Sequence, residues 1–197
     1  MSKYTFDELI INHCAPALSG IKIANIFTYQ YDSKKELEKE ISSYNDILSF
    51  KNIKVSIIKD NANKAIIYVY NEKELENYLL DDEIFEFLEN YGYKSKNIHE
   101  SIDFLKIRMQ YAESFPHEIG IFLGYPLIDI NGFINNYGKN SLYTGYWKVY
   151  HNKNEAIKIF DNYNKCRDFY ISTFLNGKGI LEIMDNYQKY VLRKNII

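Results

Sequence analysis

The sequence has little of what membrane proteins, secreted disulfide-bonded proteins and nucleic-acid-binding proteins usually contain. No run approaches the roughly 18 consecutive apolar residues that a membrane-spanning helix needs. Only two cysteines occur, Cys14 and Cys166, and the first residues do not fit a secretion signal, so we expect reduced thiols and a cytoplasmic protein. The net charge of −2 provides no basic excess for nucleic acid or an anionic membrane. The partners that we expect are a small ligand or another protein.

Several short motifs that indicate a common chemistry are also absent. The chain has no G-x-G-x-x-G and no P-loop, so the usual nucleotide-binding folds are not supported. It has no C-x-x-C and no H-E-x-x-H, which excludes the standard zinc patterns, and no G-x-S-x-G nucleophile elbow. Any site must therefore be inferred from less specific groupings of residues.

The chain is instead rich in aromatic residues and long enough for a sizeable core. Its 19 Tyr and 12 Phe residues imply that many Tyr side chains are partly buried, with the hydroxyl near water or a hydrogen-bond partner. With 197 residues, no internal repeat and no low-complexity linker, we expect a single globular domain over 1–197.

Apolar residues recur at helical or strand spacing along most of the chain. One apolar stripe predicts an amphipathic helix over 34–50, and two β-branched runs around a turn-rich tetrapeptide predict a hairpin of 54–59 with 64–70. The other expected elements are a capped helix from Thr5 to about Asn12, a strand over 23–29, helices over 73–80, 82–91, 97–112, 114–124 and 126–135, a strand over 146–150, and two C-terminal helices that meet at 177–179.

This order of elements indicates the fold class. Strand, helix, hairpin, helices, strand and helices resemble a βαββα unit that is extended by a later strand. The simplest arrangement is an α+β fold with a small, mostly antiparallel sheet of about three or four strands, covered by several helices, and a helix-rich C-terminal half.

The segment 13–22 is the first candidate site. It holds His13, Cys14 and Lys22 in a stretch that we expect to be irregular, because Pro16 and a glycine interrupt the helical pattern. A cysteine at a helix N-terminus there would be favoured as the thiolate, and a nearby ammonium group would add to this effect. The alternative is a buried, inert cysteine beside a turn, which is the commoner situation for a free thiol.

A run rich in proline and glycine that begins at Ser114 is the second candidate. If Ser114 caps a helix, His117 lies in its first turn, where the helix dipole favours a neutral ring that can act as a base or a metal ligand. Glu118 would be stabilised there as an anion. The alternative is a packing corner, in which Gly120 and Gly124 allow the close approach of a neighbouring element.

A short aromatic segment that contains the only Trp is the third candidate. Strand alternation places Tyr146, Lys148 and Tyr150 on one face and Trp147 and Val149 on the other. Lys148 lies between two aromatic residues of its face and could meet an anionic group there, whereas Trp147 is better explained as a core residue. The alternative for Lys148 is a solvated surface side chain.

Three runs of residues together resemble a known family. They are His13-Cys14-Ala15-Pro16 with Leu18, Gly20 and Lys22; Phe115-Pro116-His117-Glu118-Ile119-Gly120 with Phe122-Leu123-Gly124-Tyr125-Pro126; and Trp147-Lys148-Val149-Tyr150. Over nearly the whole chain they are similar to the uncharacterised bacterial family catalogued as domain of unknown function 3793, which occurs mainly in anaerobic, low-GC Gram-positive bacteria. The family has no assigned activity, so the resemblance implies motif positions for His13, Cys14, His117, Glu118 and Lys148 but no mechanism.

Two kinds of chemistry follow from these residues as hypotheses. In a thiol-centred site, catalytic or redox, Cys14 is the nucleophile, His117 the base, and Glu118 or His13 the orienting group. This hypothesis requires Cys14 and His117 to come within hydrogen-bond reach. In a metal site, His13, Cys14 and His117, with Glu118 and Cys166 as further donors, offer nitrogen, sulfur and oxygen ligands that suit zinc or iron.

The alternative hypothesis is a non-catalytic module that binds a small ligand or a partner protein. The motifs would then be structural, the cysteines unreactive, and a pocket or apolar patch would be lined by Tyr and Phe. Lys22, Lys148 and Tyr146 are the residues that we expect to contact a ligand. The sequence leaves the oligomeric state and the strand order open.

Overall fold

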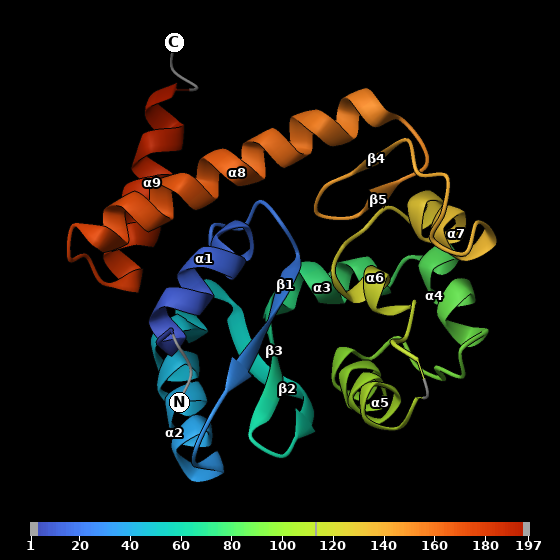
Figure 1. Ribbon diagram of the computed structural model, residues 1–197, viewed down its shortest axis with the longest axis horizontal. Helices are drawn as coiled ribbons and strands as arrows, with labels where there is room; N and C mark the ends of the chain where they lie inside the picture. Colours follow the sequence, from blue (N-terminus) through green and yellow to red (C-terminus); the bar gives the residue numbers. More distant parts are fainter. Residues whose placement is uncertain (1–3, 113, 195–197) are drawn as a thin grey trace. The chain divides into compact units, whose positions relative to one another are not determined.

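The computed structural model describes residues 4–112 and 114–194, and its α+β fold confirms the predicted class (Figure 1). The chain divides into two compact units: unit 1 is formed by the residues up to Asn71 and from Tyr163 onward, and unit 2 by Glu72–Asn162. The single globular domain that we expect over 1–197 stays a prediction. Within the described ranges, no helix has the length and apolar character needed to cross a membrane.

A three-stranded antiparallel sheet lies at the centre of unit 1. Its strand order is β1-β3-β2, and β3 pairs with both neighbours, with Phe27 opposite Ile67 and Ile67 opposite Ile57. A bulge between Ile57 and Lys59 shifts the register of β2. The strands are β1 (Ala24–Gln30), β2 (Ile53–Asn61) and β3 (Lys64–Asn71), which confirms the predicted hairpin and the preceding strand.

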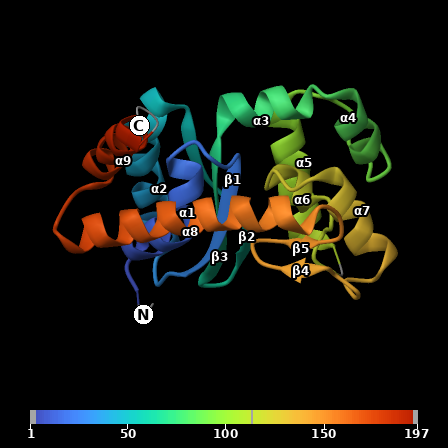
Figure 2. The ribbon, with the colours of Figure 1, turned by 90° about the horizontal axis from the view of Figure 1, so that it is seen from above.

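Helices cover one face of this sheet, as Figures 1 and 2 show. Side chains of that face, such as Phe27, Val55 and Ile67, form one buried cluster with the apolar stripes of the helices. The helices are α1 (Phe6–Leu18), α2 (Lys34–Leu48) with the short 3₁₀ turn η1 (Ser49–Lys51), the second part of α8 (Lys153–Leu175), and α9 (Ile180–Lys194).

Helix α1 is longer than the sequence predicts. The capping box at its start is present, since Thr5 and Glu8 bond to each other's backbone N–H groups. The expected end near Asn12 is wrong, because the helix continues through Pro16 to Leu18. The missing N–H of Pro16 removes only one bond near the helix end, and burial of the apolar residues around it offsets that loss. Cys14 therefore lies in the helix interior.

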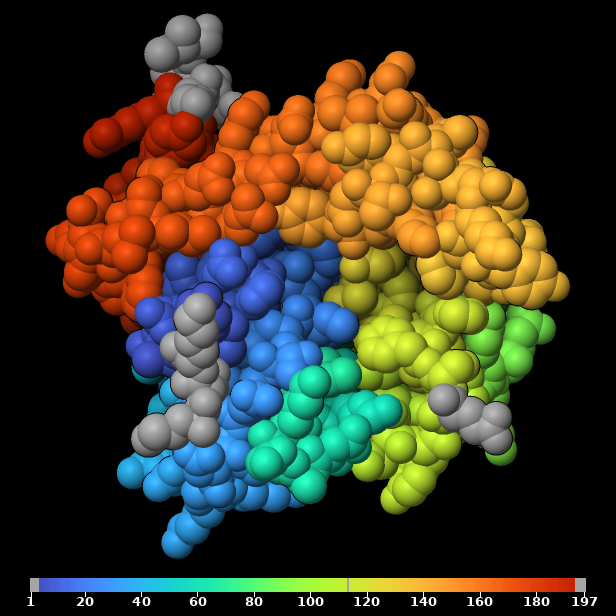
Figure 3. All heavy atoms as spheres, viewed as in Figure 1, coloured from blue at the N-terminus to red at the C-terminus, as the bar shows by residue number. Residues whose placement is uncertain are grey.

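Unit 2 is built from short helices and one small hairpin. The predicted helices over 73–80, 82–91, 97–112 and 126–135 are confirmed. The predicted cap is also present, since Asn97 accepts from the backbone N–H groups of His99 and Glu100. Atoms of α5 and of the hairpin segment both reach the visible surface of this unit (Figure 3). The elements are α3 (Glu72–Leu79), α4 (Asp82–Glu89), α5 (Ile98–Tyr111), α6 (Ile119–Phe122), α7 (Leu127–Asn135), β4 (Tyr143–Thr144), β5 (Lys148–Val149) and the first part of α8.

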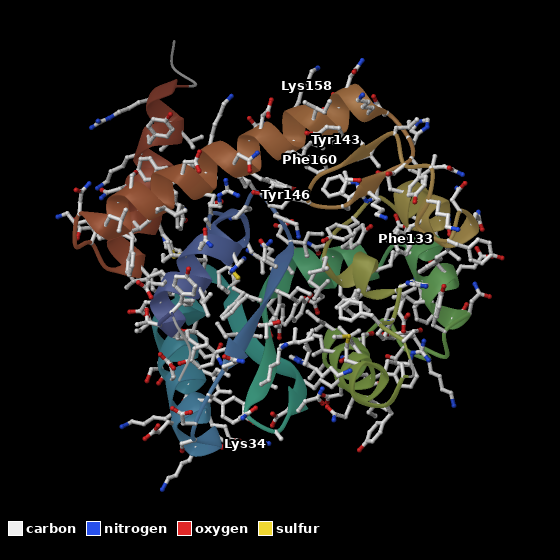
Figure 4. The ribbon with its side chains drawn as sticks, in the orientation of Figure 1. Lys34, Phe133, Tyr143, Tyr146, Lys158 and Phe160 are labelled. Atoms are coloured by element: carbon white, nitrogen blue, oxygen red, sulfur yellow. The ribbon has the colours of Figure 1, made fainter. Side chains whose placement is uncertain are left out.

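The β4–β5 hairpin is held by aromatic packing on Phe160 of α8 (Figure 4). The Phe160 ring centroid lies 6.0 Å from that of Tyr143, 5.6 Å from Tyr146 and 4.5 Å from Trp147. A Cβ atom at Gly145 would lie 2.3 Å from the Phe160 ring, so the close packing requires glycine there. The expected strand over 146–150 is confirmed as a strand, but only two of its residues, Lys148 and Val149, pair with β4.

Candidate functional site

The first predicted group of site residues lies at the end of α1, and its thiol is closed off from solvent. Cys14 is 0% exposed, and burial raises the pKa of its thiol; the nearby Lys22 opposes this rise only in part. His13 points to the surface, where its ring stacks on Phe27 at 6.2 Å. Desolvation, and then the charge of Arg167, lowers the pKa of His13. This environment disfavours the thiolate that a nucleophilic Cys14 needs.

Lys22 and Cys166 share the interior of unit 1 with Cys14. Lys22 is 5% exposed and its Nζ donates to the carbonyl oxygen of Ala24. Burial lowers the pKa of Lys22 to about 7, and the Cys14 thiolate would raise it. Cys166 of α8 donates to Ser19 Oγ at 3.2 Å, and burial raises its pKa to about 11. The Lys22 ammonium and the Cys166 thiol therefore donate hydrogen bonds to other groups of unit 1.

The hypotheses that join the two motif regions stay predictions. Cys14 belongs to unit 1 and His117 to unit 2. Within neither unit do the described residues bring together three or more His, Cys, Asp or Glu side chains that could hold a metal ion.

The second motif forms a turn and one short helix. The expected helix from Ser114 is wrong at its start, because α6 begins only at Ile119; the proline after Phe115 disfavours a helical conformation there. Gly124, at φ +69°, closes α6 in a Schellman motif, with Tyr125 N donating to Gly120 O at 2.9 Å. The predicted close approach is confirmed for Gly120, whose added Cβ would lie 2.9 Å from a side chain of α7.

Glu118 and His117 are adjacent in sequence but differ in surroundings. Glu118 is 0% exposed, and its Oε1 accepts from Arg108 Nε of α5 at 2.7 Å. Its Oε2 has no hydrogen-bond partner among the described residues. The Glu118 carboxylate raises the pKa of the Arg108 guanidinium, mainly through this hydrogen bond. The ion pair therefore anchors the turn to α5 and leaves His117 exposed beside it.

A pocket of about 200 Å³ opens beside this turn, entirely within unit 2. Its walls are mostly aromatic or aliphatic, with two basic side chains, His117 and Lys148, and one acidic side chain, Asp129. All of its lining comes from the second motif, α7, the first residue of β5 and Trp147, which precedes β5. The lining residues are Phe115, Pro116, His117, Ile119, Gly120, Tyr125, Asp129, Ile130, Phe133, Trp147 and Lys148.

Asp129 holds one side of the pocket together. This buried carboxylate accepts from Trp147 Nε1 at 2.8 Å through Oδ2. Its Oδ1 accepts from the backbone N–H groups of Tyr150 at 2.7 Å and His151 at 2.9 Å. Three donors therefore stabilise the negative charge of Asp129, and the bonds fix the Trp147 ring, which also packs on Tyr125 at 5.3 Å.

The two basic side chains of the pocket flank one aromatic ring. Lys148 Nζ lies 5.8 Å from the Phe133 centroid and donates to the carbonyl oxygen of Gly138 at 2.6 Å. The His117 ring meets Phe133 edge to face at 5.3 Å. A flat apolar body in this pocket would therefore meet aromatic walls, with a cation and an imidazole at its edge.

A family model described as "Protein of unknown function (DUF3793)" matches residues 10–184. The chain belongs to this family. The match confirms the resemblance that the three runs of residues indicate, and it includes both motif regions and every residue that lines the pocket. Comparisons with curated proteins and with solved structures found no match.

Of the predicted site residues of this DUF3793 chain, only His117 and Lys148 line the pocket. Tyr146 packs on Phe160 outside the lining. Sequence reasoning missed Asp129 and Phe133. The available signal for Asp129 was its place between two apolar residues of a predicted short helix. A carboxylate that is buried at such a position needs hydrogen-bond donors around it.

Proposed function

We propose that this DUF3793 protein is a cytoplasmic binding module that takes up a small ligand with a flat, apolar body in the pocket of unit 2. The observation that carries the proposal is the pocket itself. It has a volume of about 200 Å³, and its lining is mostly apolar and aromatic, with His117, Asp129 and Lys148 as its basic and acidic side chains. Binding sites for small molecules combine these two features. The volume is below the roughly 300 Å³ at which pockets for drug-sized molecules begin, so a ligand of one or two fused rings is expected.

The two cysteines support binding rather than thiol chemistry as the first hypothesis to test. Cys14 and Cys166 are both 0% exposed, and burial raises the pKa of both thiols. A nucleophilic or redox cysteine needs access to its substrate and a lowered pKa. Cys14, Ala15 and Leu18 of the first motif instead belong to the buried apolar cluster of unit 1, which supports a packing role for them.

The only Trp of the chain provides the test, because Trp147 lines the pocket. Its indole Nε1–H gives a single resonance in a ¹H–¹⁵N correlation spectrum, and that resonance reports directly on the pocket. We expect titration with 2-naphthamide, a flat neutral probe, to shift this resonance in a saturable way with a Kd of about a millimolar or lower.

A matched pair of variants separates the pocket from the rest of unit 2. Phe133→Ala removes a half-buried wall residue and should weaken 2-naphthamide by about tenfold. Phe87→Ala removes a half-buried ring of α4 that packs on Tyr91 outside the pocket, and should leave the affinity unchanged. No shift of the Trp147 resonance with 2-naphthamide, or equal losses in the two variants, would refute the proposal.

A further inference from the structure

We infer that the ligand of this pocket is an organic acid, whose carboxylate is bound by Lys148 Nζ while its flat body lies among the aromatic walls. This inference rests on the proposed function and adds the charge of the ligand.

Lys148 presents a cation that no carboxylate of the described residues pairs with. It is half-buried at the pocket, and none of the ion pairs of the described chain includes it. An ammonium group has three donors, and the one hydrogen bond that Lys148 Nζ forms with the described residues goes to the carbonyl oxygen of Gly138. A ligand carboxylate would supply the missing countercharge and accept a charge-assisted hydrogen bond.

Two buried carboxylates of unit 2, Asp129 and Glu118, have hydrogen-bond donors other than Lys148. Asp129 lines the same pocket, but its two oxygens accept from the Trp147 indole and from two backbone N–H groups. Glu118 does not line the pocket and pairs with Arg108. Each acid therefore has its own donors, and the charge of Lys148 remains available to a ligand.

His117 strengthens the preference for an acid at the same edge. Its side chain is exposed and forms no hydrogen bond with the described residues. It meets the Phe133 ring edge to face, and Lys148 Nζ lies over the same ring. A carboxylate beside Phe133 is therefore approached by the donors of both side chains, whereas an organic cation would meet like charge at Lys148.

Two probes of nearly equal shape test the inference. 2-Naphthoate and 2-naphthamide share their rings and differ in the charge of the substituent. We expect the unaltered protein to bind 2-naphthoate about tenfold more tightly at low ionic strength, since hydrogen bonds to charged groups are stronger than neutral ones. Because the charges are only partly buried, this preference should decrease at about 1 M salt.

Substitutions assign the preference to one side chain. Lys148→Met keeps the length of the side chain without its charge, so 2-naphthoate should bind only as well as 2-naphthamide. Lys148→Arg should retain most of the preference. Lys139→Met removes an exposed lysine next to Gly138 and should leave both affinities unchanged.

The outcomes separate the inference from the proposed function. If both probes bind the unaltered protein equally, or if the preference does not decrease with salt, the inference is overturned and the binding function stands. If neither probe shifts the Trp147 resonance, the proposed function fails and the inference with it. If Lys148→Met also loses 2-naphthamide, that variant has lost its pocket, and the salt dependence of the unaltered protein decides.

Discussion

The two motif regions share a local architecture and differ in what surrounds it. Each helix ends in a Schellman motif with a glycine in the left-handed region, Gly20 at φ +78° in one case and Gly124 at φ +69° in the other. Helix α1 places Cys14 in the core of unit 1, whereas the second motif lines a pocket of unit 2. The same turn chemistry therefore serves packing in one unit and a candidate site in the other.

The lysines of the two regions show what decides between these roles. Lys22 is only 5% exposed, and its Nζ donates to the carbonyl oxygen of Ala24, two residues along the chain. Lys148 also donates to a carbonyl oxygen, but it lies at the edge of a ligand-sized space. A polar residue in a motif indicates a site only where the fold leaves room for a ligand next to it.

The largest effect that this comparison predicts is on thiol reactivity. In the native protein at about pH 8, we expect iodoacetamide to modify Cys14 and Cys166 at least about a thousandfold more slowly than a free thiol, because a fully buried group reacts only after the structure opens. In concentrated urea both should react at the rate of a free thiol. Mass spectrometry of the two cysteine-containing peptides measures both rates.

The reverse result would restore the thiol hypothesis. If Cys14 is alkylated rapidly in the native protein below about pH 8.5 while Cys166 is not, Cys14 is an accessible, activated thiolate. The first motif would then be a reactive site, and the contrast between the two regions would be lost.

Local signals in the sequence were enough to predict most elements but not the site. The capping residues Thr5 and Asn97 mark helix starts, and the turn between two β-branched runs marks the hairpin. The end of α1 could not be predicted, because Pro16 acts locally as a helix breaker while burial of the surrounding residues acts over a distance.

The pocket itself depends on contacts that no local pattern encodes. His117 and Lys148 were candidates from the sequence, but their common neighbour Phe133 comes from a helix between them in the chain. The ion pair of Arg108 with Glu118 likewise joins α5 to the motif turn. Such tertiary pairs decide which motif residue faces a cavity, and a single sequence does not reveal them.

The second prediction separates the two neighbouring residues of the Phe-Pro-His-Glu motif. Arg108→Ala leaves the carboxylate of Glu118 buried without its cation and should lower the free energy of unfolding by about 3 kcal/mol. His117→Ala removes an exposed ring and should cost less than about 0.5 kcal/mol. Urea unfolding, followed by Trp147 fluorescence, measures both.

An arginine of unit 1 serves as the control for the loss of a surface ion pair. Arg167 contacts the exposed carboxylate of Asp168 at 3.4 Å, and Arg167→Ala should cost less than about 1 kcal/mol. If Arg108→Ala costs no more than this control, the buried ion pair does not anchor the motif turn. Glu118 would then have to be reconsidered as a member of the site.

The smallest predicted effect is a pH dependence that belongs to Lys22. Burial lowers its pKa to about 7 in the folded state, against about 10.4 in an unfolded chain. Between these values the unfolded state binds one proton more than the folded state, so stability increases as the pH rises. From about pH 6 to about pH 8, this group alone should add about 1.4 kcal/mol to the free energy of unfolding.

The variant Lys22→Met isolates this contribution, because it keeps the length of the side chain and removes its titration. His13 titrates in both proteins, and the Cys14 thiol, whose pKa burial raises far above this interval, stays protonated in both, so their contributions cancel in the difference between wild type and variant. The wild type should gain about 1.4 kcal/mol relative to the variant over that interval, measured by urea unfolding at each pH. Parallel curves for the two proteins would mean that Lys22 stays charged when folded, with solvent or an anionic group beside it. The first motif would then resemble the second, and Lys22 would join Lys148 as a candidate for binding an anion.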